Sequence, residues 1–103
     1  MATGNIKNGQ DTGWIVINST YGTRYRVRNG ICFVSIKYNG NIPDSTDIGT
    51  IPSRYAPNDS VRFSNYNPGS LDFSICLQVA TNGQCTILGA GNKWINIIGS
   101  YPV

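Results

Sequence analysis

The chain contains no histidine and no glutamate, and only 13% of its 103 residues are charged. Histidine is the usual general base and the commonest protein ligand of metal ions, so its absence removes the most frequent routes to catalysis and metal binding. Glutamate is a strong helix former, and its absence beside abundant Asn, Gly, Ile and Tyr favours strands and turns. We therefore expect a β protein that is not an enzyme and that uses no cofactor or metal.

Long apolar runs and a secretion leader are also missing. No apolar stretch approaches the roughly 20 residues of a membrane-spanning helix, and the first residues are polar and rich in Gly and Asn. We expect a soluble protein without membrane insertion. Residues 1–12 are predicted to be a flexible lead-in or a cloning remnant. Residues 13–103 are predicted to form a single β-sandwich domain, of a size that often gains stability by oligomerising.

The three cysteines, Cys32, Cys76 and Cys85, are an odd number and cannot all pair within one chain. Their spacing contains no Cys-x-x-Cys, which gives a zinc site little support. The pattern favours reduced, mostly buried thiols that behave as small apolar side chains, in a protein that folds in a reducing cytoplasm. A Cys76–Cys85 bridge across a hairpin is the alternative.

Residues 24–28 alternate strictly between arginine and apolar side chains. In a strand, Tyr25 and Val27 then point to one face and the three arginines to the other. Asn29-Gly30 follows, which is the strongest short hairpin signal because both residues tolerate positive φ. The return strand is predicted over residues 31–38, ending at the turn signals of residues 39–41.

Further short strands are predicted at residues 14–17, 48–51, 61–66, 73–79, 85–88 and 94–98. A second Asn-Gly hairpin is expected at Asn82-Gly83, and one strand face should point to the core: Phe73, Ile75, Leu77 and Val79. No window keeps helical periodicity over three turns. About eight short strands with frequent turns predict an antiparallel β-sandwich or jelly-roll-like head domain.

Two groups of residues are candidates for binding. Arg24, Arg26 and Arg28 form a candidate anion site for phosphate or carboxylate, because guanidinium groups suit both; the alternatives are a subunit interface or a solvated face that pairs with Asp. The second group lies on and after a loop between Pro52 and Pro57, where aromatic rings can stack on sugars and polar groups can bind hydroxyls. Its members are Arg54, Tyr55, Asn58, Asp59, Tyr66 and Asn67. For the loop tyrosines, and more strongly for Trp94, packing in the core or at an interface is the alternative.

Other chemistry has weak support. Asp44 and Asp47 are close in sequence, but turn-forming Asp residues bond to their own backbone, and we interpret these two in that way. A net charge of +3 with a pI of about 8.9 is mildly basic. This charge is too low and too dispersed to predict a nucleic-acid partner.

The order of these motifs resembles the C-terminal head or tip domains of bacteriophage tail-fibre and upper baseplate receptor-binding proteins. The likeness rests on the opening Trp14 strand, the segment 24–30, the Ile51-Pro52/Tyr55/Pro57 loop and the segment 81–84 before a late strand. In that family an arginine follows the loop tyrosine. Here it stands before the tyrosine, as Arg54, and Ala56 fills its usual place.

The resemblance implies a domain of the virion tail tip, made in the host cytoplasm, that forms a homotrimer and contacts other tail proteins. It implies adhesion to a host cell-surface glycan or teichoic-acid-like glycopolymer. A structural module that only trimerises is the alternative function, and a glycan depolymerase is the least supported one because His and Glu are absent.

Overall fold

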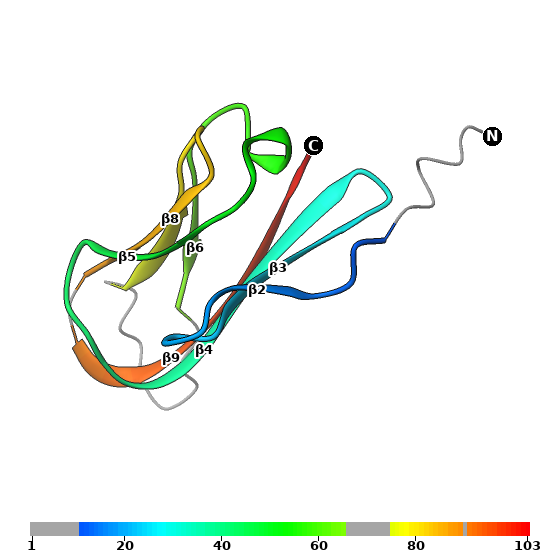
Figure 1. The fold of residues 1–103 in the computed structure, drawn as a ribbon. Coiled ribbons are helices and arrows are strands. Elements are labelled where there is room, and N and C mark those ends of the chain that lie inside the picture. Colours follow the sequence, from blue (N-terminus) through cyan, green and yellow to red (C-terminus); the bar gives the residue numbers. More distant parts are fainter. Residues whose placement is uncertain (1–10, 66–74, 90) are drawn as a thin grey trace.

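The computed structural model describes residues 11–65, 75–89 and 91–103, which form two four-stranded antiparallel sheets packed face to face (Figure 1). The prediction of an all-β sandwich of about eight strands is confirmed. The first sheet has the order β2 (Ile15–Asn18), β3 (Thr23–Arg28), β4 (Ile31–Ile42) and β9 (Gly91–Pro102). The second has the order β5 (Thr46–Thr50), β8 (Gln84–Leu88), β7 (Cys76–Val79) and β6 (Val61–Ser64).

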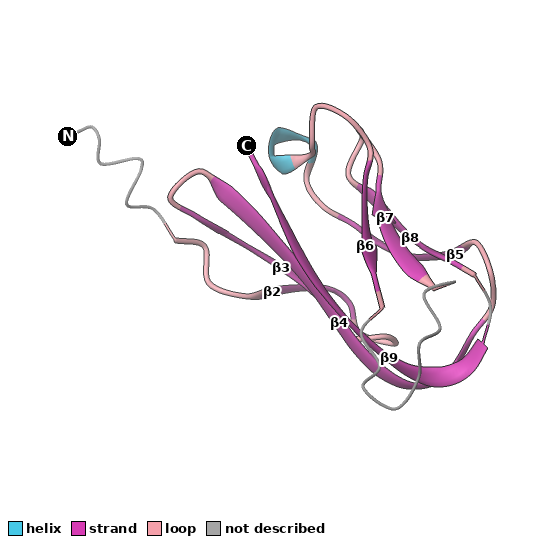
Figure 2. Ribbon diagram, turned by 180° about the vertical axis from the view of Figure 1, so that it is seen from behind, coloured by secondary structure: helices cyan, strands magenta, loops and turns pink. Residues whose placement is uncertain are grey.

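The two longest strands, β4 and β9, have 12 residues each and pair along their whole length, from Ile31 opposite Pro102 to Ile42 opposite Gly91. Their shared ribbon curves at the end where the chain passes to the second sheet, as Figure 2 shows from behind. The prediction that the turn signals at residues 39–41 end the first of these strands was wrong. The ladder with β9 holds these residues extended, because long-range pairing outweighs their local turn preference.

The core lies between the sheets, where the inward-facing residues of both meet. On β3, Tyr25 and Val27 are buried, while Arg24 and Arg26 on the opposite face are only partly buried, as the alternation predicted. The predicted inward face of residues 73–79 is confirmed for the buried Ile75, which precedes β7, and for Leu77 and Val79 on β7; Phe73 lies outside the described residues. Of the two packing roles expected for Trp94, the core position is wrong, because 46% of its surface is exposed on the outer face of β9, and the interface position stays a prediction.

Asn65 joins the two sheets at their edge. Its side-chain Nδ2 donates to the Trp94 carbonyl at 3.3 Å, and its Oδ1 accepts from the Asn96 amide at 2.8 Å. The side chain therefore takes the place of a neighbouring strand along part of the outer edge of β9. Because Asn65 is buried, it serves this contact and not a ligand.

The cysteines are all free thiols. In the β7–β8 ladder, Cys76 lies opposite Leu88 and Cys85 opposite Val79, so the two thiols point to opposite faces of the hairpin. This register excludes the bridge across the hairpin, because a disulfide needs the Cβ atoms to face each other. Cys32 and Cys85 are buried, and burial raises the pKa of Cys85 to about 12.

Thiol reactivity should follow this burial. In the native protein at pH 8, we expect a thiol reagent to modify Cys76 first and to reach Cys32 and Cys85 only through unfolding, because the thiolate is the reacting form. Burial raises the pKa of Cys85 in the folded chain, so above about pH 9 the unfolded chain releases a proton that the folded chain retains. The free energy of unfolding should therefore fall as the pH rises from about 9 towards 12. Mass spectrometry of timed labelling checks the order; equal rates at all three thiols would contradict it.

Candidate functional site

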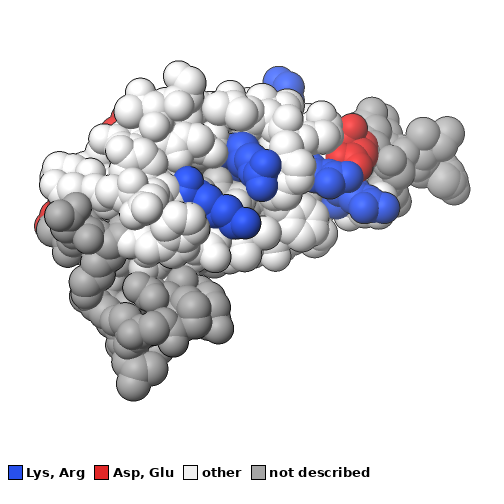
Figure 3. Space-filling model, turned by 90° about the horizontal axis from the view of Figure 1, so that it is seen from below, with Lys and Arg blue, Asp and Glu red and all other residues white. Residues whose placement is uncertain are grey.

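The outer face of the first sheet carries four cationic side chains, Arg24, Arg26, Arg28 and Lys37. The three arginines alternate with core residues along β3, and Lys37 lies two residues beyond Ser35, the direct partner of Arg24 on β4. Side chains directly opposite each other in a ladder share a face, so the four point the same way. Figure 3 shows basic side chains gathered on one face of the molecule. We call these four residues, with Trp14 beside them, the basic face.

At one end of the basic face, Asp11 forms an ion pair with Arg26. The Arg26 Nε lies 2.8 Å from one carboxylate oxygen of Asp11, and Nη2 bonds to the other, which makes a bidentate pair. Arg28 Nε lies 4.0 Å from the same carboxylate. The hydrogen bonds from Arg26 and from the Gly13 amide hold the pKa of Asp11 well below its usual range. The carboxylate therefore stays ionised at neutral pH and offsets part of the charge at this end.

Asp11 and Thr12 also connect this segment to β3. The Thr12 amide donates to the Val27 carbonyl at 3.0 Å, and the Thr12 hydroxyl accepts from the Val27 amide at 2.9 Å. Both residues fall within the stretch predicted to be a flexible lead-in. Their bonds show that these two residues belong to the sheet and bring a carboxylate to the arginines.

Arg24 is held in a different way. Its guanidinium carbon lies 4.6 Å from the centroid of the Trp14 ring, a cation–π distance. Among the described residues, no carboxylate forms an ion pair with Arg24 or Lys37. The contact with the Trp14 ring limits the movement of the guanidinium and does not engage its N–H groups in an ion pair. Arg24 is thus oriented without having its donors taken by an acidic partner.

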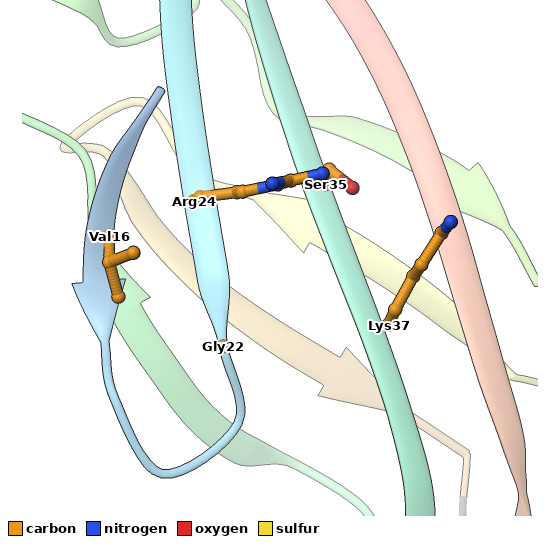
Figure 4. A pocket seen from close by; sticks show the side chains of 5 residues that line it. All are labelled: Val16, Gly22, Arg24, Ser35 and Lys37. Atoms are coloured by element: carbon orange, nitrogen blue, oxygen red, sulfur yellow. The ribbon is translucent and has the colours of Figure 1, made fainter. Parts of the chain in front are cut away.

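Two shallow hollows lie on the basic face. One, of about 170 Å³, is lined by Trp14, Arg26, Arg28 and Phe33. The other, of about 270 Å³, is lined by Val16, Gly22, Arg24, Ser35 and Lys37. Figure 4 shows the Arg24 side chain lying across β4 towards Ser35, with Lys37 further along the same strand. Both hollows are open to solvent, which suits contact with part of a long ligand.

The proline loop lies apart from the two hollows, and its tyrosine contacts other parts of the chain. A 3-10 turn, η2 (Ser53–Tyr55), presents Arg54, whose guanidinium carbon lies 4.8 Å from the Tyr55 ring centroid. The Tyr25 ring packs near the same ring at 6.1 Å, and the Tyr101 hydroxyl donates to the Tyr55 carbonyl at 2.8 Å. The Tyr55 ring is therefore engaged with its own chain on the inner side of the first sheet, away from the basic face.

The remaining predicted loop residues are spread out. Asn58 and Asp59 are exposed after the buried Pro57, while Tyr66 and Asn67 lie outside the described residues. The structure thus separates the two predicted sites and brings together only the arginines. Sequence analysis missed Lys37, Trp14 and Asp11 as neighbours of the arginines. Lys37 carried a signal, because it shares a face with Phe33 and Ser35 in the alternating pattern, but only the register places it beside Arg24.

The two Asp residues considered for other chemistry both accept hydrogen bonds from backbone amides. Asp44 accepts from the Gly89 amide at 2.8 Å, and Asp47 accepts from the Gly49 amide at 2.9 Å. The Asp47 bond lies within its own turn, as predicted. The prediction was wrong for Asp44, because its bond joins the loop before β5 to the distant Gly89. The part of the chain that the structure describes contains no cluster of three or more His, Cys, Asp or Glu residues able to hold a metal ion. Nor does any helix in that part have the length and apolar character to cross a membrane.

Comparison with known proteins leaves the site to be interpreted from its own chemistry. No model of a known protein family matches the chain, and a search of curated proteins finds no match either.

Proposed function

We propose that this chain is a receptor-binding domain of a phage tail fibre or baseplate that adheres to an anionic glycopolymer on the host surface. The observation that carries the proposal is the basic face. It contains four cationic side chains and a partly exposed tryptophan, and one described carboxylate, Asp11, offsets part of its charge. Such a face attracts an anionic chain, and the partly exposed Trp14 ring adds an aromatic surface on which sugar C–H groups can pack.

The open shape of the face supports adhesion to a polymer. Hollows of about 170 and 270 Å³ accept single groups of a ligand, so each contact is expected to be weak. A trimer would present three such faces, and simultaneous contact would raise the overall affinity without new contacts. The resemblance to tail-fibre heads supports the same arrangement.

A structural module that trimerises without binding a glycan is the second candidate. Ile98 and Trp94 favour it, because they expose 64% and 46% of their surface on the outer face of β9. Exposed apolar side chains of this size are typical of interfaces. In this arrangement a neighbouring chain would cover the β9 side of the sheet.

Sedimentation of the purified chain with host cells and with their extracted wall glycopolymer tests adhesion. We expect binding that weakens about tenfold or more between 0.05 and 0.3 M salt, because exposed charges are screened. Trp14→Ala should reduce adhesion, and Arg62→Gln is the matched control, since Arg62 lies on β6 and bonds to Gln78. Light scattering should report about three chains. A trimer that binds no cells would support the structural module and contradict adhesion.

The loop residues provide a contrast. Tyr55→Ala should lower the melting temperature, because the ring packs against Tyr25, and should leave adhesion per folded molecule unchanged. Loss of adhesion in Tyr55→Ala with an unchanged melting temperature would move the site to the loop.

A further inference from the structure

We infer that the hollow between Arg24 and Lys37 is the anion subsite of this domain, and that it takes the phosphodiester of a glycopolymer. This inference rests on the proposed function for the origin of the ligand but not for the chemistry of the subsite. Its starting point is that the cations of the basic face are not equivalent. Arg26 and Arg28 share the Asp11 carboxylate, whereas no described carboxylate pairs with Arg24 or Lys37.

On this face, Arg26 is an arginine whose guanidinium is already bound to a carboxylate, that of Asp11. Two of its N–H groups already bind two carboxylate oxygens, so an incoming anion would have to displace Asp11. The guanidinium carbon of Arg24 instead lies 4.6 Å from the Trp14 ring centroid, a contact that limits the movement of the guanidinium, and no described carboxylate occupies its N–H groups. An anion arriving at Arg24 therefore meets a donor set that is already oriented, and less side-chain entropy is lost on binding.

The sheet shapes the hollow around Arg24. Val16, Arg24 and Ser35 form one row across three strands, and Lys37 stands two residues along β4. Gly22, at φ +74°, has open space where a side chain would begin, so it leaves the end of the hollow free. The resulting volume of about 270 Å³ is large enough for a phosphate group with part of a neighbouring unit.

The lining favours a phosphodiester over a carboxylate. The guanidinium of Arg24 and the ammonium of Lys37 come from two strands and lie at separate points of the hollow, with the buried Ser35 beneath Arg24. A tetrahedral phosphate offers oxygens in several directions and can meet such separated donors, whereas a carboxylate offers two oxygens in one plane. The carboxylate arrangement is the one seen at the other end of the face, where a single arginine fork binds Asp11.

Titration with three polymers of matched charge number tests the subsite: poly(glycerol phosphate), polygalacturonate and oligothymidylate. Chemical-shift mapping should place poly(glycerol phosphate) at Val16, Arg24, Ser35 and Lys37. Arg24→Gln should weaken its binding about tenfold or more, and Lys37→Gln severalfold, because a charge-assisted hydrogen bond is lost in each. Arg26→Gln should change binding less than twofold, and Arg62→Gln not at all. Asp11→Asn should strengthen binding by releasing Arg26.

Several results would overturn the inference. Equal losses in Arg24→Gln and Arg26→Gln would mean a diffuse charged surface, and tighter binding of polygalacturonate would assign a carboxylate ligand. Tighter binding of oligothymidylate would assign a nucleic acid. Lys37 is exposed, so Lys37→Gln keeps the test valid if Arg24→Gln impairs folding. Binding of the phosphate polymer without adhesion to cells would contradict the proposed function but support the subsite. Adhesion that Arg24→Gln leaves unchanged would support the proposed function but contradict the subsite.

Discussion

Replacing Gly83 with alanine is expected to destabilise the domain more than any other single methyl addition considered. A Cβ at this position would lie 2.0 Å from the Ile51 carbonyl oxygen, and the residue has φ +91°. The same junction holds two backbone hydrogen bonds of 2.8 Å, from Ile51 N to the Gly83 carbonyl and from Gly83 N to the Ala80 carbonyl. Relief of the clash must move backbone and break one of them. We expect a loss of about 4 kcal/mol or more, and a melting temperature lower by roughly 15 °C or more.

Gly22→Ala is the matched control for this effect. Gly22 also has a positive φ, of +74°, but a Cβ there would meet nothing within 4 Å. Its alanine variant carries only the strain of the left-handed conformation, about 1–2 kcal/mol. Urea unfolding of the two variants separates dihedral strain from the clash. Similar midpoints for Gly22→Ala and Gly83→Ala would show that the contact with Ile51 is unimportant.

Gly99→Ala should have the next largest effect, for a different reason. Gly99 is on β9, and a Cβ there would enter the Phe63 ring of β6, 2.2 Å from its Cγ atom. The residue faces the core between the two sheets, so the ring must move or the sheets must separate. We expect a loss of about 2–4 kcal/mol, at the upper end of overpacking effects. Thermal unfolding followed by circular dichroism measures it.

A double-mutant cycle identifies the cause. Phe63→Ala removes the ring and should itself cost about 2–3 kcal/mol, less than a fully buried Phe because the side chain is only partly buried. In the double variant the new methyl group occupies space that the ring has left. The stability loss of the double variant should therefore be smaller than the sum of the two single losses by at least about 1 kcal/mol. Strict additivity would mean that Gly99→Ala acts on the strand and not on the ring.

Local pattern was enough to predict much of the sandwich. The alternation of residues 24–28 placed Tyr25 and Val27 in the core and the arginines outside, and the two Asn-Gly pairs marked real hairpins, with φ +52° at Asn29 and +91° at Gly83. These features depend on a two-residue period and on backbone preferences of single residues, both of which can be read from neighbouring positions.

The candidate site could be predicted only in part. The three arginines were recognised as one face, but the different partners of Arg24 and Arg26 were not, because Trp14 and Asp11 belong to the segment before β2 and meet β3 only in the folded chain. The proline loop looked like a platform for Tyr55, yet its ring packs against Tyr25 and Arg54. A stacked ring and an exposed ring have the same sequence signal.

The sequence by itself therefore determined the strand-forming segments, their inward faces, their tight turns and the common direction of Arg24, Arg26 and Arg28. Only the tertiary structure decided the lengths of β4 and β9 and the contact of Asn65 with β9. It also decided that Lys37 lines the same hollow as Arg24, while Asp11 forms an ion pair with Arg26. The physical reason is one of range. Side-chain alternation acts between neighbours along the chain, whereas strand register and charge pairing depend on which distant segments the fold brings together.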